Sequence, residues 1–338
     1  MTLATRKLGR DGLEITTLGL GTWAIGGGGW AFGWGPQDDA RSVATVRHAV
    51  ELGVNWIDTA AIYGHGQSEE VVGKAVRALP ESERPYVFTK CGLTWDESDP
   101  MKDAEGDLSP ASIRRECEAS LRRLGLEHID LYQFHWPDEG GVPVEESWAA
   151  MAALADEGKV RWCGVSNFSI ELLDSCEAVR HVDSLQPPFS LIERETASRE
   201  LPWCRQHETG VIVYSPMQSG LLTGSFSKDR VAALPDDDWR ARDDEFREPN
   251  LSRNLTLRDL LRPIAERLGA TVETVAVRWV LEWEGVTGAI VGARSPEQVD
   301  GWIGAASLDL SEKDLDDIAT AIVASQAGRG RERPRLGH

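Results

Sequence analysis

The stretch IDLYQFH, residues 129–135, is a short apolar run that ends in a residue able to carry out chemistry. Similar runs recur along the chain and lead to Asp58, Lys90, Ser166, Gln186, Tyr214 and Arg294. If each run is a strand of one parallel sheet, these polar side chains meet at the carboxyl ends of the strands. The sequence therefore predicts a site built at one face of a parallel sheet.

Eight strands are predicted, near residues 18, 56, 87, 131, 163, 185, 212 and 290. Helical periodicity falls between and after these strands. It covers residues 38–52, 68–79, 110–124, 144–157, 169–179, 198–208, 255–268, 272–283 and 311–324. Strands that alternate with helices indicate βαβ crossovers. Eight such units favour an α/β fold closed into a single (β/α)8 TIM barrel, and an open doubly wound sheet is the alternative.

Three segments are expected outside the repeating units. Residues 7–16 form an N-terminal hairpin that turns at Asp11-Gly12 and could close the lower end of the barrel. Between strands seven and eight, residues 223–254 form a long, polar loop without clear structure. We expect residues 1–325 to make the barrel and residues 326–338, rich in glycine and arginine, to be a frayed tail.

Composition limits the classes of binding partner and indicates the cellular compartment. The net charge of −19 disfavours nucleic acid and anionic membranes. Five cysteines, without CxxC spacing, indicate reduced thiols in a cytoplasm rather than disulfides or a zinc site. Residues 1–10 lack the apolar core of a signal peptide, and the uncharged residues 15–37 contain eight glycines, too many for a membrane helix. The acidic surface shows no assembly face, so we expect a monomer.

Asp58, Tyr63, Lys90 and His135 together suit acid–base chemistry on a carbonyl. A lysine ammonium would lower the pKa of a tyrosine from its usual value near 10, and a carboxylate would hold the ammonium in place. A histidine could hydrogen-bond a carbonyl oxygen. Alternatively, Asp58 and Lys90 form a structural ion pair and His135 is a core residue, but four such residues at strand ends argue against that.

The chain resembles the aldo-keto reductases. The matching motifs are DTAAIYG at 58–64, Lys90, IDLY at 129–132 with His135, GVSNF at 164–168 and GAR at 292–294. Within the family it is most similar to bacterial general-stress and inositol-operon reductases, which share GLGTWAIGG at 19–27 and HWPD at 135–138. The resemblance implies that Tyr63 is the general acid, that Lys90 and Asp58 tune it, and that His135 orients the carbonyl.

The resemblance also implies a nicotinamide dinucleotide held without a Rossmann domain. Ser166, Asn167 and Gln186 match residues that hold the carboxamide, and Tyr214 matches an aromatic residue that stacks on the nicotinamide. Alternatively, Ser166 and Asn167 only start a helix and Tyr214 is core. The other expected cofactor positions are Gly21, Thr22, Trp23, Asp58, Ser215, Pro216, Gln218, Gly220, Leu221, Gly224, Gly292, Ala293, Arg294 and Gln298.

The segment RSPEQ, residues 294–298, bears on the choice between NADP and NAD. Ser295 and Gln298 fit a capping box, and Pro296 fits the first turn of a helix. A helix N-terminus favours phosphate, and Arg294 could clamp a 2′-phosphate, which favours NADP. A well-capped helix alone is the alternative. Typical relatives often carry a second basic residue where Ser295 stands.

The substrate side is expected to be aromatic. Several tryptophans follow strand ends, at Trp23, Trp30, Trp34, Trp95 and Trp136. Such a pocket suits aromatic or aliphatic aldehydes and ketones, and sugars also stack on tryptophan. The loop 223–254 could fold as a lid over the cofactor.

We therefore expect an NADP-dependent reductase of small carbonyl compounds, in which Tyr63 gives the proton. Two alternatives stay open. One is a sugar or polyol dehydrogenase that works in the oxidative direction. The other is a regulatory protein that binds NADPH, turns over slowly and senses redox state.

Overall fold

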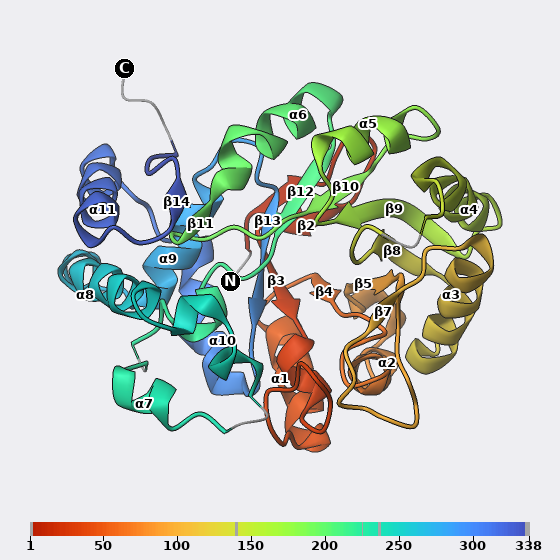
Figure 1. Ribbon diagram of the computed structural model, residues 1–338, viewed down its shortest axis with the longest axis horizontal. Coiled ribbons are helices and arrows are strands. Elements are labelled where there is room, and N and C mark those ends of the chain that lie inside the picture. Colours follow the sequence, from red (N-terminus) through yellow and green to blue (C-terminus); the bar gives the residue numbers. More distant parts are fainter. Residues whose placement is uncertain (1–2, 139–140, 225, 236–237, 335–338) are drawn as a thin grey trace.

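The computed structural model describes residues 3–138, 141–224, 226–235 and 238–334. Eight parallel strands close into a barrel with helices outside it (Figure 1). Around the ring the strands are β3 (Leu18–Gly21), β4 (Trp56–Asp58), β5 (Tyr86–Cys91), β8 (Ile129–Phe134), β9 (Val160–Ser166), β10 (Ser184–Gln186), β12 (Gly210–Val213) and β13 (Gly288–Gly292). Pairing of β13 with β3 closes the ring, so the TIM-barrel prediction is confirmed and the open sheet is excluded.

The long helices surround the strands and follow the predicted ranges to within a few residues. They are α1 (Asp39–Glu51), α2 (Gln67–Arg77), α3 (Pro110–Leu124), α4 (Val144–Asp156), α5 (Ile170–Glu177), α6 (Glu200–His207), α8 (Asn250–Leu268), α9 (Val272–Leu281), α10 (Pro296–Ile303) and α11 (Glu312–Ser325). Helix α3 shows why local signals succeed: the Ser109 side chain accepts from the Ser112 amide, and Gly125 ends the helix with φ 64°.

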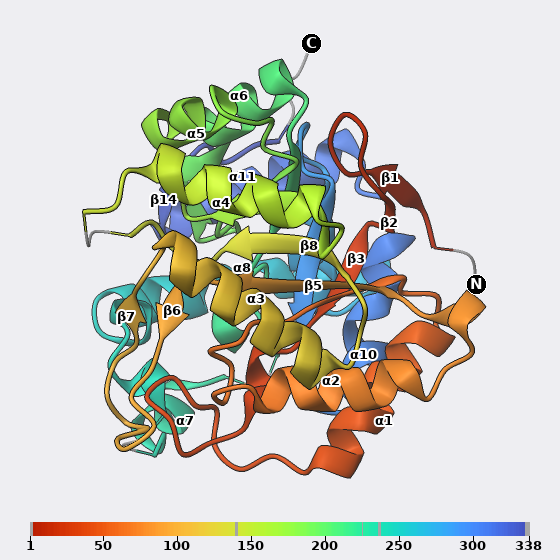
Figure 2. The same cartoon turned by 90° about the vertical axis from the view of Figure 1, so that its right-hand side faces the viewer.

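The predicted N-terminal hairpin is confirmed and closes the barrel at one end. Strands β1 (Thr5–Lys7) and β2 (Glu14–Thr16) pair antiparallel. Apolar side chains on and between them pack against Trp56 and Phe88 inside the barrel. A Cβ at Gly19 would lie 2.2 Å from the Trp56 ring, so only glycine fits beside that indole. Figure 2 shows this hairpin at the opposite end of the molecule from β6 (Leu93–Thr94) and β7 (Glu105–Gly106).

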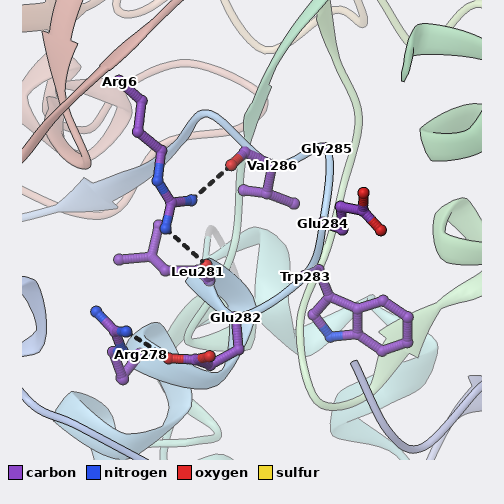
Figure 3. A pocket seen from close by; sticks show the side chains of 8 residues that line it. All are labelled: Arg6, Arg278, Leu281, Glu282, Trp283, Glu284, Gly285 and Val286. Atoms are coloured by element: carbon purple, nitrogen blue, oxygen red, sulfur yellow. Dashed lines mark hydrogen bonds and ion pairs between the residues drawn. The ribbon is translucent and has the colours of Figure 1, made fainter. Parts of the chain in front are cut away.

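Arg6 ties the hairpin to the loop that precedes β13. Its guanidinium donates to the carbonyl oxygens of Leu281, at 3.1 Å, and Val286, at 2.7 Å (Figure 3). A hollow of about 300 Å³ lies beside it and is lined also by Arg278, Glu282 and Trp283. Because this loop enters β13 at its amino end, the hollow is remote from the strand ends that carry the predicted site.

The loop between β12 and α8 is more ordered than the sequence indicated. It contains α7 (Lys228–Ala232) and the short 3-10 helices η5 (Trp239–Ala241) and η6 (Asp244–Phe246), and α8 begins at Asn250 rather than near 255. The ring centroids of Phe226 and Phe246 are 5.7 Å apart, and both side chains are part of the main hydrophobic core. Residues 225 and 236–237 of the predicted loop lie outside the described residues.

Part of the tail that was expected to fray is ordered. Strand β14 (Arg329–Gly330) pairs with β11 (Glu193–Arg194). The buried Arg194 guanidinium donates to the carbonyl oxygens of Ala327 and Gly330. The segment 326–334 is therefore attached to the barrel, because its carbonyl oxygens accept hydrogen bonds from Arg194. Residues 335–338 lie outside the described residues. In the described part of the chain, no helix combines the length and apolar character needed to cross a bilayer.

Candidate active site

Asp58, Lys90 and Tyr63 lie together at the carboxyl ends of β4 and β5. The Lys90 Nζ donates to Asp58 Oδ1 at 2.5 Å, to the Thr59 carbonyl oxygen at 2.9 Å and to Tyr63 Oη at 3.3 Å. Lys90 and Asp58 are both buried. The Lys90 side-chain nitrogen thus lies between a carboxylate and the phenol oxygen.

Two buried amides complete the surroundings of Asp58. Gln186 Nε2 donates to Asp58 Oδ2 at 2.9 Å and to Gln133 Oε1 at 3.2 Å. Gln133 Nε2 lies 3.4 Å from the same Asp58 oxygen. Both carboxylate oxygens of Asp58 are therefore hydrogen-bonded, one to Lys90 and the other to the two amides.

Burial favours the uncharged forms of both Tyr63 and His135. Burial, and then the Asp58 carboxylate, raise the pKa of Tyr63 well above its ordinary value. The sequence predicts that the Lys90 ammonium lowers this pKa; the shift is in the opposite direction, because burial raises it. Burial, and then Lys90, lower the pKa of His135 well below its ordinary value. The two rings meet edge to face, with centroids 5.6 Å apart, so a neutral phenol and a neutral imidazole face the same space.

The expected nicotinamide residues form one hydrogen-bonded chain. Tyr214 Oη donates to Asn167 Oδ1 at 2.8 Å. Asn167 Nδ2 donates to the His135 carbonyl oxygen at 2.9 Å and to Ser166 Oγ at 3.0 Å. Ser166 Oγ donates to the Gln186 carbonyl oxygen at 2.7 Å. The structure therefore gathers these four residues beside His135.

The segment that follows β12 has an unusual backbone. Ser215, Gln218 and Ser219 have φ of 56°, 45° and 52°, and Gly220 has φ of 102°. Each non-glycine residue in this region costs roughly 1–3 kcal/mol, and such strain clusters at ligand sites. Pro216 and Leu221 are buried, while Gly224 is exposed. The segment fits a role in holding the nucleotide.

At the closing seam of the barrel, Gly21 of β3 pairs with Gly292 of β13. Thr22 follows Gly21, and its hydroxyl donates to the Asp58 carbonyl oxygen at 3.0 Å. Gly292 is exposed although the rest of β13 is buried, and Ala293 after it is buried. Through Thr22, the expected cofactor positions on these two strands border Asp58.

Arg294 is committed to the β3–α1 loop. Its guanidinium donates to Gln37 Oε1 at 2.8 Å, to the Trp34 carbonyl oxygen at 2.9 Å and to the Pro36 carbonyl oxygen. The predicted capping box is wrong: Gln298 Oε1 accepts from the Arg294 amide at 2.7 Å, and the Ser295 side chain makes no cap bond. The hydroxyl of Ser295 instead hydrogen-bonds Glu297, which lowers the pKa of that carboxyl.

The five predicted pocket tryptophans divide into two groups. Trp23 packs edge to face with Trp34, with ring centroids 5.3 Å apart. It also stacks on Trp239 of η5, with ring centroids 5.0 Å apart. Trp23 also lies over Tyr63, with centroids 6.2 Å apart. Trp23 therefore links Trp239 to Tyr63, and the Arg240 guanidinium lies 4.6 Å from the centroid of the Trp34 ring.

Trp30 and Trp95 form the second group with His65, which lies between them. Trp136 belongs to neither group: its side chain is 48% exposed and makes no ring contact with the described aromatic residues. The structure thus brings four of the five tryptophans to the mouth of the site.

Comparison with known proteins agrees with this geometry. Residues 17–323 match the Aldo/keto reductase family. The chain belongs to this family. It is 39% identical to the aldo-keto reductase YhdN of Bacillus subtilis over 312 residues, which cover 92% of this chain and 91% of that protein. It is 35% identical to an NADH-specific methylglyoxal reductase of Escherichia coli over 327 residues, or 93% and 98% of the two chains.

A solved structure is also similar to this aldo-keto reductase. The glycerol dehydrogenase AKR11B4 of Gluconobacter oxydans superposes with a TM-score of 0.87 at 38% sequence identity, and the match covers 100% of each chain. As a member of the family, the protein is an oxidoreductase that interconverts carbonyls and alcohols with a nicotinamide cofactor and a small-molecule substrate.

Sequence reasoning missed three residues of this reductase site: Gln133, His65 and Trp239. Alternation along β8 places Gln133 on the same face as Leu131 and His135, so a polar residue inside the barrel could have been noticed. His65 stands between two glycines, two residues after Tyr63. Trp239 is not marked by the sequence as a site residue, because its contacts with Trp23 and Trp34 span about two hundred positions.

Proposed function

We propose that this aldo-keto reductase reduces aldehydes or ketones to alcohols with NADPH, and that Tyr63 is its general acid. The single observation that carries the proposal is the placement of Lys90 Nζ between Asp58 Oδ1 and Tyr63 Oη. A tyrosine with this pKa keeps its proton at neutral pH and can give it up only when the acceptor oxygen becomes strongly basic, as a reduced carbonyl does.

The cofactor supplies hydride to the carbonyl carbon. Tyr63 Oη then transfers its proton to the carbonyl oxygen, and the Lys90 ammonium stabilises the phenolate that remains. Asp58 holds that ammonium in place. The neutral His135 ring donates a hydrogen bond that orients the carbonyl oxygen. In the oxidative direction the Tyr63 phenolate accepts the proton from the alcohol.

Ser166, Asn167, Gln186 and Tyr214 are proposed to hold the nicotinamide, since they already form a connected set beside His135. A preference for NADP is proposed on the strength of Arg294, which stands before α10. The Escherichia coli relative is named NADH-specific, so the preference needs its own test. The aromatic loops at Trp23 and Trp239 are proposed to cover the bound cofactor.

The remaining assignments are also proposals. We place the protein nearest the bacterial general-stress and inositol-operon reductases, as a monomer in the cytoplasm; its five cysteines are all free. A second function, oxidation of a polyol, is favoured by the full-length similarity to a glycerol dehydrogenase. An intact catalytic set argues for an enzyme over a slow redox sensor.

The test is consumption of NADPH and NADH with a panel of aldehydes, ketones and sugars, together with reduction of NADP⁺ by polyols. Tyr63→Phe should lower carbonyl reduction by about a hundredfold or more. Tyr86→Phe is the matched control, because Tyr86 begins β5 and lies at the other end of that strand from Lys90. Equal activity of Tyr63→Phe and wild type would overturn the proposal.

A further inference from the structure

His65 is held at the mouth of the site by two indole rings. It lies in the loop between β4 and α2, and its imidazole stacks on Trp95 with centroids 5.1 Å apart and planes 6° apart. On the other side Trp30 meets it at 5.9 Å and 64°. The two tryptophans come from the loops after β3 and β5, so three consecutive strand-end loops meet at this imidazole.

The backbone fixes the direction of this side chain. His65 has φ 52°, between Gly64 at 62° and Gly66 at 99°. Its amide donates to the Ile62 carbonyl oxygen at 3.1 Å. A histidine with a left-handed backbone is uncommon and strained. The conformational preference of the residue therefore does not explain this turn.

The ring nitrogens of His65 have no hydrogen-bond partner among the residues that the structure describes. The side chain is half-buried, and ring contacts alone hold it in place. Burial lowers the pKa of His65, which favours the neutral ring at neutral pH. A neutral imidazole offers one N–H donor and one nitrogen acceptor, the pair of functions that a hydroxyl group satisfies.

Through Trp30 and Trp95, His65 adjoins the apolar cluster against which Tyr63 packs. Trp30 packs in one apolar cluster with Ala60 and Ile62, and Tyr63 and Trp95 pack against that cluster. The Tyr63 ring in turn faces His135. A substrate whose carbonyl oxygen lies at Tyr63 and His135 reaches His65 when its adjoining carbons extend along this cluster toward Trp30 and Trp95.

We infer that His65 is a specificity-determining residue that hydrogen-bonds a hydroxyl group next to the reacting carbon. The substrate class is then small hydroxy aldehydes or hydroxy ketones, and vicinal diols in the reverse direction. Indole faces accept the C–H surfaces of such molecules, while an apolar substrate would leave the imidazole without a partner. This inference rests on the proposed carbonyl reductase function and names its substrate class.

The test compares glyceraldehyde with propanal, which lacks the two hydroxyl groups. His65→Phe keeps a ring between Trp30 and Trp95 but removes both nitrogens. We expect it to lower kcat/KM for glyceraldehyde by about tenfold and to change kcat/KM for propanal by less than about twofold. His65→Asn, which tolerates the left-handed backbone, should keep part of the preference for glyceraldehyde. Equal losses on both aldehydes, or an unchanged ratio, would overturn the inference.

A second measurement does not depend on turnover. In the protein loaded with NADP⁺ or NAD⁺, the imidazole NMR signal of His65, assigned by its absence in His65→Phe, should shift with glycerol and not with propan-1-ol. If no carbonyl is reduced with either cofactor, the proposed function fails, and this measurement still decides the hydroxyl contact. If both alcohols shift the signal equally, or neither does, the inference about His65 fails while the reductase function stands.

Discussion

Lys90 Nζ lies 2.5 Å from Asp58 Oδ1 inside the barrel, where the two side chains are only 0% and 3% exposed. Two opposite charges so far from water compensate each other, and either one alone would be a buried unpaired charge. The catalytic role proposed for the pair is therefore coupled to the stability of the barrel, and experiment can separate the two.

The Lys90→Met variant should be strongly destabilised. Removing the ammonium leaves the Asp58 carboxylate buried without its counter-ion, which costs about 3–5 kcal/mol of unfolding free energy. Adding Asp58→Asn should restore much of this stability, because no charge is left, but should restore no carbonyl reduction. Urea denaturation of the single and double variants measures the effect. A single variant as stable as wild type would show that Asp58 takes up a proton at little cost.

Gln133 should affect the rate more than substrate binding. Its amide faces Asp58 Oδ2 and the amide of Gln186. Gln133→Leu should lower kcat by about threefold to tenfold and leave KM for the aldehyde within about twofold, since one hydrogen bond to a charged group is lost. Gln133→Glu should lose activity further as pH rises, because a second carboxylate beside Asp58 becomes charged. Identical pH profiles for the two variants would argue for a packing role alone.

Arg294 should discriminate between the two dinucleotides. If it binds the 2′-phosphate, Arg294→Ala should raise KM for NADPH by about tenfold or more and KM for NADH by less than about threefold. Because Arg294 also holds the β3–α1 loop, Gln37→Ala is the matched control: it removes one partner of Arg294 and keeps the charge. Equal loss with both cofactors in Arg294→Ala would assign the residue to the loop instead.

Glu116 should make the protein less stable as pH rises. Burial raises its pKa from 4.5 to about 7, although Gly92 and Ser112 donate hydrogen bonds to it. A raised pKa means that the stabilising contribution is present below pH 4.5, the ordinary pKa, and is lost as pH rises through the folded value of about 7. Glu116→Gln should therefore gain about 1–3 kcal/mol over wild type at pH 8 and little at pH 5. Denaturation at the two pH values checks this, and a gain independent of pH would exclude the titration.

The barrel could be predicted because its signals are local. Each strand is a short apolar run, and helices such as α3 carry their own caps. Asp58, Lys90 and His135 stand directly at strand ends, and Tyr63 follows β4 closely, so closure of the barrel alone brings them together. Family motifs then pointed to the same residues.

The rest depends on contacts between distant loops. Trp239 stacks on Trp23, and Arg294 binds the carbonyl oxygens of the β3–α1 loop, yet neither partner is marked by spacing or periodicity. The expectation that the tail frays rests on its composition. Composition does not show that Arg194 supplies the hydrogen-bond donors that attach this segment. The pKa of Tyr63 could not be predicted either, because its direction depends on burial, which a sequence does not give.

The hairpin that fills one end of the barrel has a kinetic consequence. Leu8, Leu13 and Ile15 pack inside that end of the barrel, so we expect both ligands to enter at the other end, where Trp239 stacks on Trp23. The ligand that binds second must then dissociate first. We therefore expect ordered turnover, in which oxidised nucleotide dissociates last and inhibits competitively against reduced nucleotide but not against aldehyde.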